Sequence, residues 1–147
     1  MADTFKLVTI YKVATANIRD VLFEGEAGNF DGTTQNIQIP LSRSYNNYDI
    51  LGFYARTNWN GAYRYFYTEV PTELLDNVRT INHNDDDKVS FCWGYGTSID
   101  FCDINKTTTD TKLNANIGWM LITKIVGIKY VNIGTLINNT QEVTNND

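Results

Sequence analysis

Hydrophobic and polar residues alternate along most of this chain, in short segments separated by turn-forming residues. Thr, Tyr, Ile, Val and Phe dominate these segments, and these residue types favour β-sheets. Strands are expected at Phe5–Val13, Val21–Glu26, Thr34–Pro40, Tyr48–Thr57, Ala62–Val70, Lys88–Tyr95, Ile99–Asn105 and Ile117–Val131. Short strands with regular turn signals predict an all-β fold, an antiparallel and jelly-roll-like β-sandwich in a single domain.

Helical patterns are almost absent. Pro71 is followed by Glu73 and a pair of leucines, so we expect at most one short helix, at Pro71–Val78. The sandwich is predicted to span residues 20–131. Residues 1–19 would form an attachment segment or a first strand, and residues 132–147 would form a polar tail.

The dipeptide Asn60-Gly61 is a two-residue hairpin signal, for which a type I′ turn with positive φ at both residues is expected. This turn fixes the pairing of the flanking strands. It places Trp59 opposite Ala62, Thr57 opposite Arg64, Ala55 opposite Phe66, and Phe53 opposite Thr68. One side of the hairpin then gathers apolar residues for the core, namely Leu51, Phe53, Ala55, Phe66 and Val70.

The other side of this hairpin is aromatic and amphipathic. It carries Tyr54, Arg56, Asn58, Tyr63, Tyr65, Tyr67 and Glu69, of which Tyr54, Arg56, Tyr63, Tyr65 and Tyr67 are the candidate contact residues. Burying Arg56 and Glu69 in a monomer would be costly, so this side is expected to face outward or across a subunit boundary. Three interpretations are open: an ordinary outer sheet face with cross-strand pairs, a subunit interface, or a glycan-binding face.

A second hairpin is expected around Gly96-Thr97-Ser98. A three-residue loop there would pair Trp93 with Phe101 and place Cys92 directly opposite Cys102. A cross-strand disulfide is then conceivable, but nothing in the sequence signals an oxidising compartment, so two free thiols are favoured. The core residues expected from both hairpins include Phe53, Phe66, Phe91, Trp93 and Phe101. A bulge is also expected at Gly127, where the apolar side of the last strand changes over.

Composition and charge exclude several classes of function. The chain has 147 residues, a net charge of −5 and a pI near 4.7, with no cluster of Lys or Arg. Binding to nucleic acid or to an anionic membrane surface is therefore not expected. No apolar run is long enough to span a membrane, and the first residues lack a continuous apolar signal segment, so synthesis in a cytosol is expected.

The sequence offers no convincing catalytic constellation. His83 is the single histidine, and no nucleophile motif accompanies it. The acidic run Asn84–Lys88 lacks the ligand order of a calcium-binding loop and is interpreted as a solvated turn. Apart from Asp100 and Asp103, which are candidates for an apolar setting, no carboxylate has one that would suit it to acid catalysis. We predict no enzymatic activity, no catalytic residue, no metal site and no cofactor.

Two segments together resemble a known class of module. These are "DVLFEGEAGNFDGTTQNIQIPLSRSYNNYDILGFYA" (Asp20–Ala55) and "NIGWMLITKIVGIKY" (Asn116–Tyr130). Their order, an "LFEG" strand, an "NYD" strand entry and a closing "KIVGIK" strand, resembles the small β-sandwich modules of phage and prophage fibre and receptor-binding proteins. The resemblance covers about Asp20 to Tyr130, and its motifs are structural.

This resemblance implies a non-enzymatic virion protein, made in the bacterial host cytoplasm. It implies a homotrimer in a head fibre, tail fibre or baseplate, which contacts other virion proteins and has a host-surface glycan as a candidate receptor. Because the module begins close to Met1, a small fibre-tip or head-fibre subunit is expected rather than a full fibre. The alternative is a free carbohydrate-binding module, which would commonly be a monomer.

Overall fold

The computed structural model describes residues 15–92 and 100–132. The chain divides into two compact units, one of residues 19–128 and one of residues 1–18 with 129–147. Of the second unit, only the strand ends at residues 15–18 and 129–132 are described. The predicted strand Phe5–Val13 lies outside the described residues.

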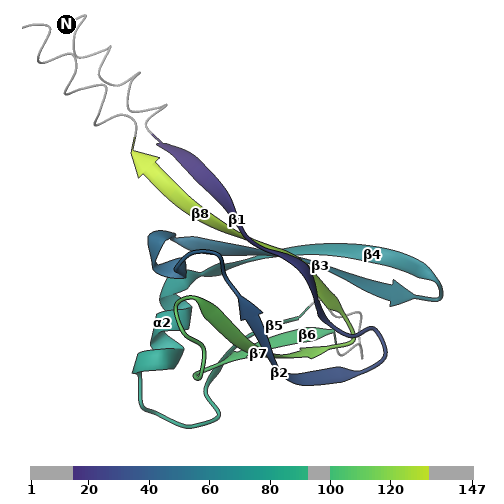
Figure 1. The fold of residues 1–147 in the computed structure, drawn as a ribbon. Helices are drawn as coiled ribbons and strands as arrows, with labels where there is room; N and C mark the ends of the chain where they lie inside the picture. Colours follow the sequence, from purple (N-terminus) through teal and green to yellow (C-terminus); the bar gives the residue numbers. More distant parts are fainter. Residues whose placement is uncertain (1–14, 93–99, 133–147) are drawn as a thin grey trace, which may run out of the picture. The chain divides into compact units, whose positions relative to one another are not determined.

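The unit of residues 19–128 is an antiparallel β-sandwich, as predicted (Figure 1). One sheet has the order β1-β8-β3-β4 and the other has the order β2-β7-β6-β5. The strands of the first sheet are β1 (Thr15–Gly28), β8 (Leu121–Asn132), β3 (Ile50–Trp59) and β4 (Ala62–Pro71). Those of the second are β2 (Thr33–Pro40), β7 (Lys112–Gly118), β6 (Phe101–Asn105) and β5 (Lys88–Cys92). A 3₁₀ turn (η1, Tyr45–Asn47) and one helix (α2, Thr72–Thr80) complete the described elements.

The first two and the last two strands of the chain are arranged as in a jelly roll. In a jelly roll a long hairpin is rolled up, so the first strand lies beside the eighth and the second beside the seventh. Both neighbours are present here, in different sheets. The four strands in the middle of the chain instead pair with their neighbours in sequence, β3 with β4 and β5 with β6. As a result, β4 is the last strand of its sheet.

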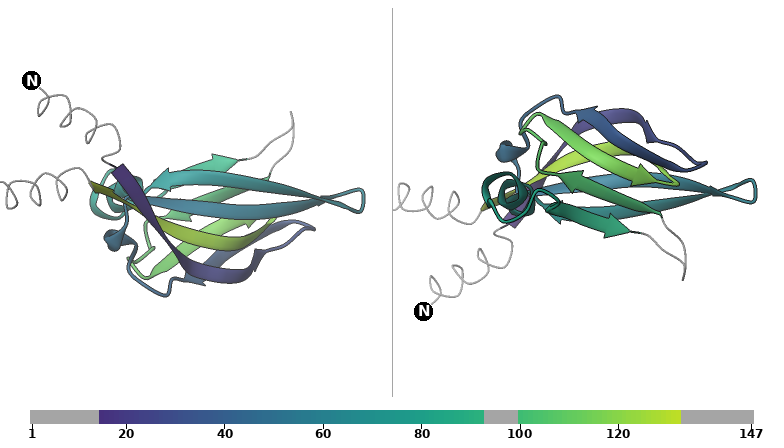
Figure 2. Two further views of the ribbon diagram at one scale, coloured as in Figure 1. Left: turned by 90° about the horizontal axis from the view of Figure 1, so that it is seen from above. Right: turned by 90° about the horizontal axis from the view of Figure 1, so that it is seen from below.

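The β3–β4 hairpin has the pairing that the Asn60-Gly61 turn predicted. Trp59 pairs with Ala62 and the ladder continues without a break to Ile50 and Pro71. Both turn residues have positive φ, 51° at Asn60 and 82° at Gly61, which confirms the predicted turn. The tip of this hairpin lies beyond the ends of the neighbouring strands (Figure 2).

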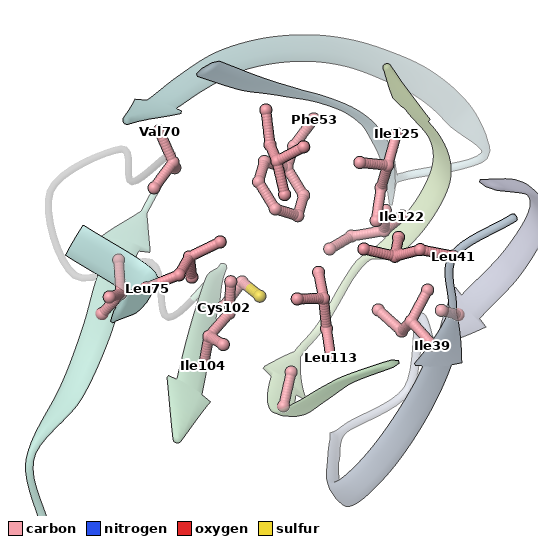
Figure 3. Close-up of a cluster of buried hydrophobic side chains, with 14 of the residues drawn as sticks. Ile39, Leu41, Phe53, Val70, Leu75, Cys102, Ile104, Leu113, Ile122 and Ile125 are labelled. Atoms are coloured by element: carbon pink, nitrogen blue, oxygen red, sulfur yellow. The ribbon is translucent and has the colours of Figure 1, made fainter. Parts of the chain in front are cut away.

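Inward side chains from both sheets form the core (Figure 3). Phe53, Ile122 and Ile125 from the first sheet meet Leu113 and Ile104 from the second, and all five are at most 1% exposed. Fully burying one such side chain stabilises a fold by about 1.5–3 kcal/mol. The predicted core side of the hairpin is confirmed for Leu51, Phe53, Ala55 and Val70, which are buried, whereas Phe66 is half-buried.

The predicted single strand at Ile117–Val131 is wrong. The segment contains the end of β7 and all of β8, which belong to different sheets. Trp119, with a φ of 58°, and Met120 make the connection between the two sheets. The backbone N–H of Trp119 donates to the carbonyl of Gly32 at 2.9 Å, which fixes this connection against the β1–β2 turn. The remainder of β7, from Lys112, was not predicted at all.

The bulge predicted at Gly127 is also misplaced. The β3–β8 ladder is regular at Gly127, which pairs with Leu51. Its register shifts instead between Tyr54 and Ala55, whose partners are Lys124 and Ile122, so the extra residue is Thr123.

The predicted pairing of the second hairpin is wrong by one residue. Cys92 pairs with Phe101, and Phe91 pairs with Cys102. Such a shift exchanges the two faces of a strand, so Cys102 points into the core while Cys92 is exposed. Both cysteines are free, as favoured from the sequence, but the expected opposition between them does not exist.

The shift also changes which aromatic residues are buried. Phe91 lies against Phe53, with ring centroids 4.9 Å apart, but it is only half-buried, as is Phe101. Five aromatic residues were expected to be buried, and four of them are described. Of these four, only Phe53 is fully buried. Trp93 lies outside the described residues.

The single predicted helix is present. α2 spans Thr72–Thr80, one residue later than predicted at its start, with Pro71 as the N-cap. Leu75 is buried in the core. Among the described residues, no helix is long and apolar enough to cross a membrane.

Candidate functional site

The five candidate contact residues lie on one side of the β3–β4 hairpin, as the register argument predicted. Tyr54 pairs with Tyr67 and Arg56 pairs with Tyr65, while Tyr63, opposite Asn58, lies two pairs nearer the turn. Alternation along a strand sends these side chains away from the core. We call this surface, made by Tyr54, Arg56, Tyr63, Tyr65 and Tyr67, the tyrosine face.

The tyrosine face is open to solvent in the described structure. The exposed fractions are 73% for Tyr65, 51% for Tyr63 and 40% for Tyr67. Tyr54 and Arg56 are half-buried beneath them. Tyr54 and Tyr67 pack at a centroid distance of 4.7 Å, and Tyr63 and Tyr65 meet edge to face at 6.5 Å. The rings therefore form two contacting pairs on one side of the hairpin rather than scattered surface residues.

Arg56 joins this patch to the first strand. Its guanidinium lies 5.0 Å from the centre of the Tyr63 ring and 2.6 Å from a carboxylate oxygen of Glu26 in β1. Phe30, in the turn after β1, stacks on Tyr63 at 5.7 Å. The Nε of Arg56 is buried and has no hydrogen-bond partner within the described part of the chain. The planar cation thus lies against both rings of the stacked pair, 5.0 Å from the centre of Tyr63 and 6.0 Å from that of Phe30.

The Tyr67 hydroxyl is the most constrained polar group of the tyrosine face. It accepts a hydrogen bond from Arg19 at 2.8 Å and donates one to Glu69 at 2.8 Å. Burial is the main cause that raises the pKa of Tyr67 to about 12, and the bond to Glu69 acts in the same direction. Gly52 leaves room for this arrangement, because a Cβ there would lie 2.5 Å from the Tyr67 hydroxyl.

The charge of this surface differs from that of the whole chain. Arg19, Arg56 and Lys124 lie over its rings, and Lys124 is 5.2 Å from the centre of the Tyr54 ring. Two acidic residues, Glu26 and Glu69, accompany these three cations. The surface is therefore slightly cationic, although the chain carries −5. Its ion pairs are at least partly exposed to solvent, so each contributes about 1 kcal/mol or less to stability.

Sequence reasoning missed the residues of this surface that come from outside the hairpin, namely Arg19, Glu26, Phe30 and Lys124. It also left out Trp59, which is 60% exposed near the hairpin tip and lies 5.9 Å from the guanidinium of Arg64. Because successive side chains along a strand point to opposite sides, Trp59 and Arg64 lie on the side of the hairpin opposite the tyrosine face.

The other candidates from the sequence lie outside the tyrosine face and take part in local ion pairs. His83 is exposed and lies 3.2 Å from Asp87 within the turn before β5. Asp85 in the same turn pairs with Lys106 at 2.6 Å, which lowers the pKa of the Asp85 carboxyl. Asp103 pairs with Lys88 at 3.3 Å. Within residues 15–92 and 100–132, no group of three or more His, Cys, Asp or Glu side chains could hold a metal ion.

No family model matches this chain, and no curated protein is significantly similar to it.

Proposed function

We propose that this protein is a non-enzymatic structural subunit of a phage particle, located in a small fibre or at a fibre tip. It acts in particle assembly and in attachment to the host surface. The observation that carries the proposal is the tyrosine face: two contacting pairs of tyrosines, three of them solvent-exposed, on one side of a regular β-hairpin.

Tyrosine rings suit both parts of this function. Each ring offers a flat apolar surface and a hydroxyl, with few rotatable bonds to immobilise on binding, which is why Tyr is enriched in protein interfaces. The partly cationic surroundings add hydrogen-bond donors from Arg19 and Arg56. A monomer seldom leaves such a patch open to water without a partner. The resemblance of Asp20–Tyr130 to phage fibre modules supplies the particle as the setting, with a homotrimer as the proposed assembly.

A free carbohydrate-binding module is the second candidate, and one observation favours it. Tyr63 and Tyr65 expose their rings at adjacent positions of one strand face, an arrangement that can stack against sugar rings. Such a module would commonly be a monomer and would have no place in a particle.

Two measurements separate these proposals. Light scattering on the purified chain should give the mass of three chains, or of six where two trimers associate, for the fibre subunit, and of one chain for the free module. A density map of the particles made by the cell that encodes this chain should then contain a site into which the sandwich of residues 19–128 fits. A monomeric chain and particles without such density would overturn the fibre proposal.

A further inference from the structure

The outer edge of β4 carries backbone groups with no partner strand among the described residues. β4 ends its sheet, and only β3 pairs with it. In a two-residue hairpin the residues next to the turn, here Trp59 and Ala62, form a hydrogen-bonded pair, and such pairs then alternate along the ladder. The N–H and C=O groups of Tyr63, Tyr65, Tyr67 and Glu69 therefore point away from β3. None of the turn, loop or cap hydrogen bonds uses these groups.

The edge of β4 lacks the protection that β2 and β5, the edge strands of the second sheet, have. β2 contains a register shift between Thr34 and Ile37 and a residue with positive φ, Asn36. β5 begins with Lys88. β4, in contrast, is a regular strand of ten residues, and its proline is its last residue. Bulges, short strands and lysines are the usual means of preventing edge pairing, so the unprotected edge of β4 indicates a partner strand.

We propose that this partner is β4 of a second copy of the chain, which pairs antiparallel with it about a two-fold axis. Such an axis stands perpendicular to the sheet, so the core side of one copy continues into the core side of the other. Residues opposite each other must then come from the same side of the strand. Two registers meet this condition with equal and maximal overlap, one with the axis at Phe66 and one with the axis at Tyr67, and we place the axis at Phe66.

Side-chain chemistry favours this register. Tyr65 lies opposite Tyr67 of the partner subunit, which extends the aromatic patch across the axis by a cross-strand ring pair. Arg64 lies opposite Thr68 of the partner subunit, so no like charges face each other. A register shifted by two residues would instead place Pro71 of the partner subunit opposite Tyr63, where an N–H donor is needed and proline has none.

Charge complementarity adds to this choice. Tyr63 lies opposite Glu69 of the partner subunit in the proposed register. The Tyr63 ring is already stacked with the cation of Arg56, so the partner's carboxylate approaches a cationic position. The same contact occurs twice, because the axis repeats it.

This inference goes beyond the proposed function and does not depend on it. Edge pairing joins chains two at a time, so it gives a dimer, or six chains where a trimer is also present. A trimer without edge pairing contains three chains. Sedimentation equilibrium over a range of concentrations therefore distinguishes the two associations by mass.

The decisive variant removes one outward N–H group and leaves the β3–β4 ladder intact. Tyr65→Pro does this, because proline is tolerated in an edge strand where its missing donor faces solvent. Tyr65→Ala is the matched control, since it removes the side chain but keeps the N–H. We expect Tyr65→Pro to raise the dissociation constant at least tenfold more than Tyr65→Ala does, and to halve the mass. A wild-type mass of one or three chains, unchanged in Tyr65→Pro, would overturn the proposal.

A cross-linking experiment tests the register and remains informative if Tyr65→Pro fails to fold. In a Cys92→Ser background, Phe66→Cys should form an intermolecular disulfide on oxidation, because the axis brings position 66 next to its own copy. Thr68→Cys is the control, since position 68 faces position 64 of the partner subunit and should cross-link far less. Equal cross-linking of the two variants, or none in either, would contradict the proposed pairing. Retained edge pairing with no binding to cells or particles would leave this inference standing and remove the proposed function.

Discussion

The aromatic ring of Tyr48 lies directly against Gly127 in β8. A Cβ atom at position 127 would be 2.5 Å from Cγ of Tyr48, well inside van der Waals contact. Tyr48 cannot easily move away, since it is buried and its hydroxyl donates a hydrogen bond to Asp20 at 2.7 Å. Gly127 therefore serves packing in a regular part of the ladder, rather than the bulge expected there.

Gly127→Ala should lower the free energy of unfolding by about 1–3 kcal/mol, the usual cost of forcing an extra methyl group into a packed core. Urea denaturation monitored by tryptophan fluorescence would measure this loss. Gly32→Ala is the matched control, because a Cβ at position 32 meets no atom within 4 Å. Similar midpoints for the two variants would contradict the packing role of Gly127.

Gly61 tests the backbone alone, because a Cβ there also meets nothing within 4 Å while φ is +82°. Gly61→Val should destabilise the fold by about 1–2 kcal/mol, since a β-branched residue is strained in the left-handed region. Gly61→Asn should cost clearly less, because asparagine tolerates this region. If thermal melting ranks the two variants equally, backbone strain is not what Gly61 relieves.

The β3–β4 hairpin could be predicted from sequence because its turn fixes the pairing. A two-residue Asn-Gly loop leaves one choice of closing pair, and every pair from Trp59–Ala62 onward follows from it. The separation into a core side and the tyrosine face follows equally, since side chains alternate.

The β5–β6 pairing could not be predicted in the same way. The loop between these strands has no turn signal that fixes its length, and an error of one residue placed Cys102 on the outer side, whereas it lies in the core. β7 was missed for a different reason. Its buried residues Leu113, Ala115 and Ile117 alternate correctly, but asparagines between them lower the apparent strand propensity.

The candidate site was predictable only in part. Alternation within one hairpin identifies its own tyrosines and Arg56. Its partners Glu26 and Phe30 come from β1 and from the turn after it. They contact Arg56 only because the tertiary fold places the end of β1 and this turn next to the β3–β4 hairpin. Such contacts between distant segments carry no local signal in the sequence.

The two cysteines should differ sharply in reactivity. Cys92 is exposed, whereas Cys102 is completely buried, and burial raises the pKa of the Cys102 thiol far above its usual range. Native protein should therefore show one fast-reacting thiol in a thiol titration, and denatured protein should show two. Cys92→Ser should have none that reacts fast. Two fast thiols in the native wild type would contradict the β5–β6 register.

A partly buried network at α2 gives a pH dependence. The hydroxyl of Tyr45 donates to Asp76 at 2.7 Å and accepts from Arg79 at 2.7 Å. Burial is the main cause that raises the pKa of Tyr45 from 10.0 to about 12. The folded state thus favours the protonated hydroxyl more than the unfolded state does.

Stability from this hydroxyl should be fully present below pH 10.0 and be lost as the pH rises towards about 12, because only the unfolded chain releases its proton in that window. The loss attributable to Tyr45 should be about 2 kcal/mol. Chemical denaturation across this range should show a steeper decline for the wild type than for Tyr45→Phe, which lacks the titrating group. Parallel pH profiles would show that Tyr45 titrates normally.

The tyrosine face itself is tested by removing its two central rings. Tyr65→Ala with Tyr67→Ala opens the patch while the β3–β4 ladder, which uses backbone groups, remains. A matched control removes two exposed apolar side chains elsewhere, Leu74→Ala with Ile81→Ala, whose exposed fractions are 43% and 56%. Thermal melting should confirm that both double variants fold.

The result of that pair of substitutions distinguishes the roles proposed for the tyrosine face. A subunit interface loses the aromatic contacts that hold it, so light scattering on Tyr65→Ala with Tyr67→Ala should show a smaller mass than for the control. A receptor site keeps the assembly whole but loses its stacking surface, so binding to host cells or to their isolated glycans should fall at least tenfold, at a cost of about 1.4 kcal/mol or more. Unchanged mass and unchanged binding, both equal to those of the control, would reduce the tyrosine face to the outer side of a sheet stabilised by cross-strand aromatic pairs.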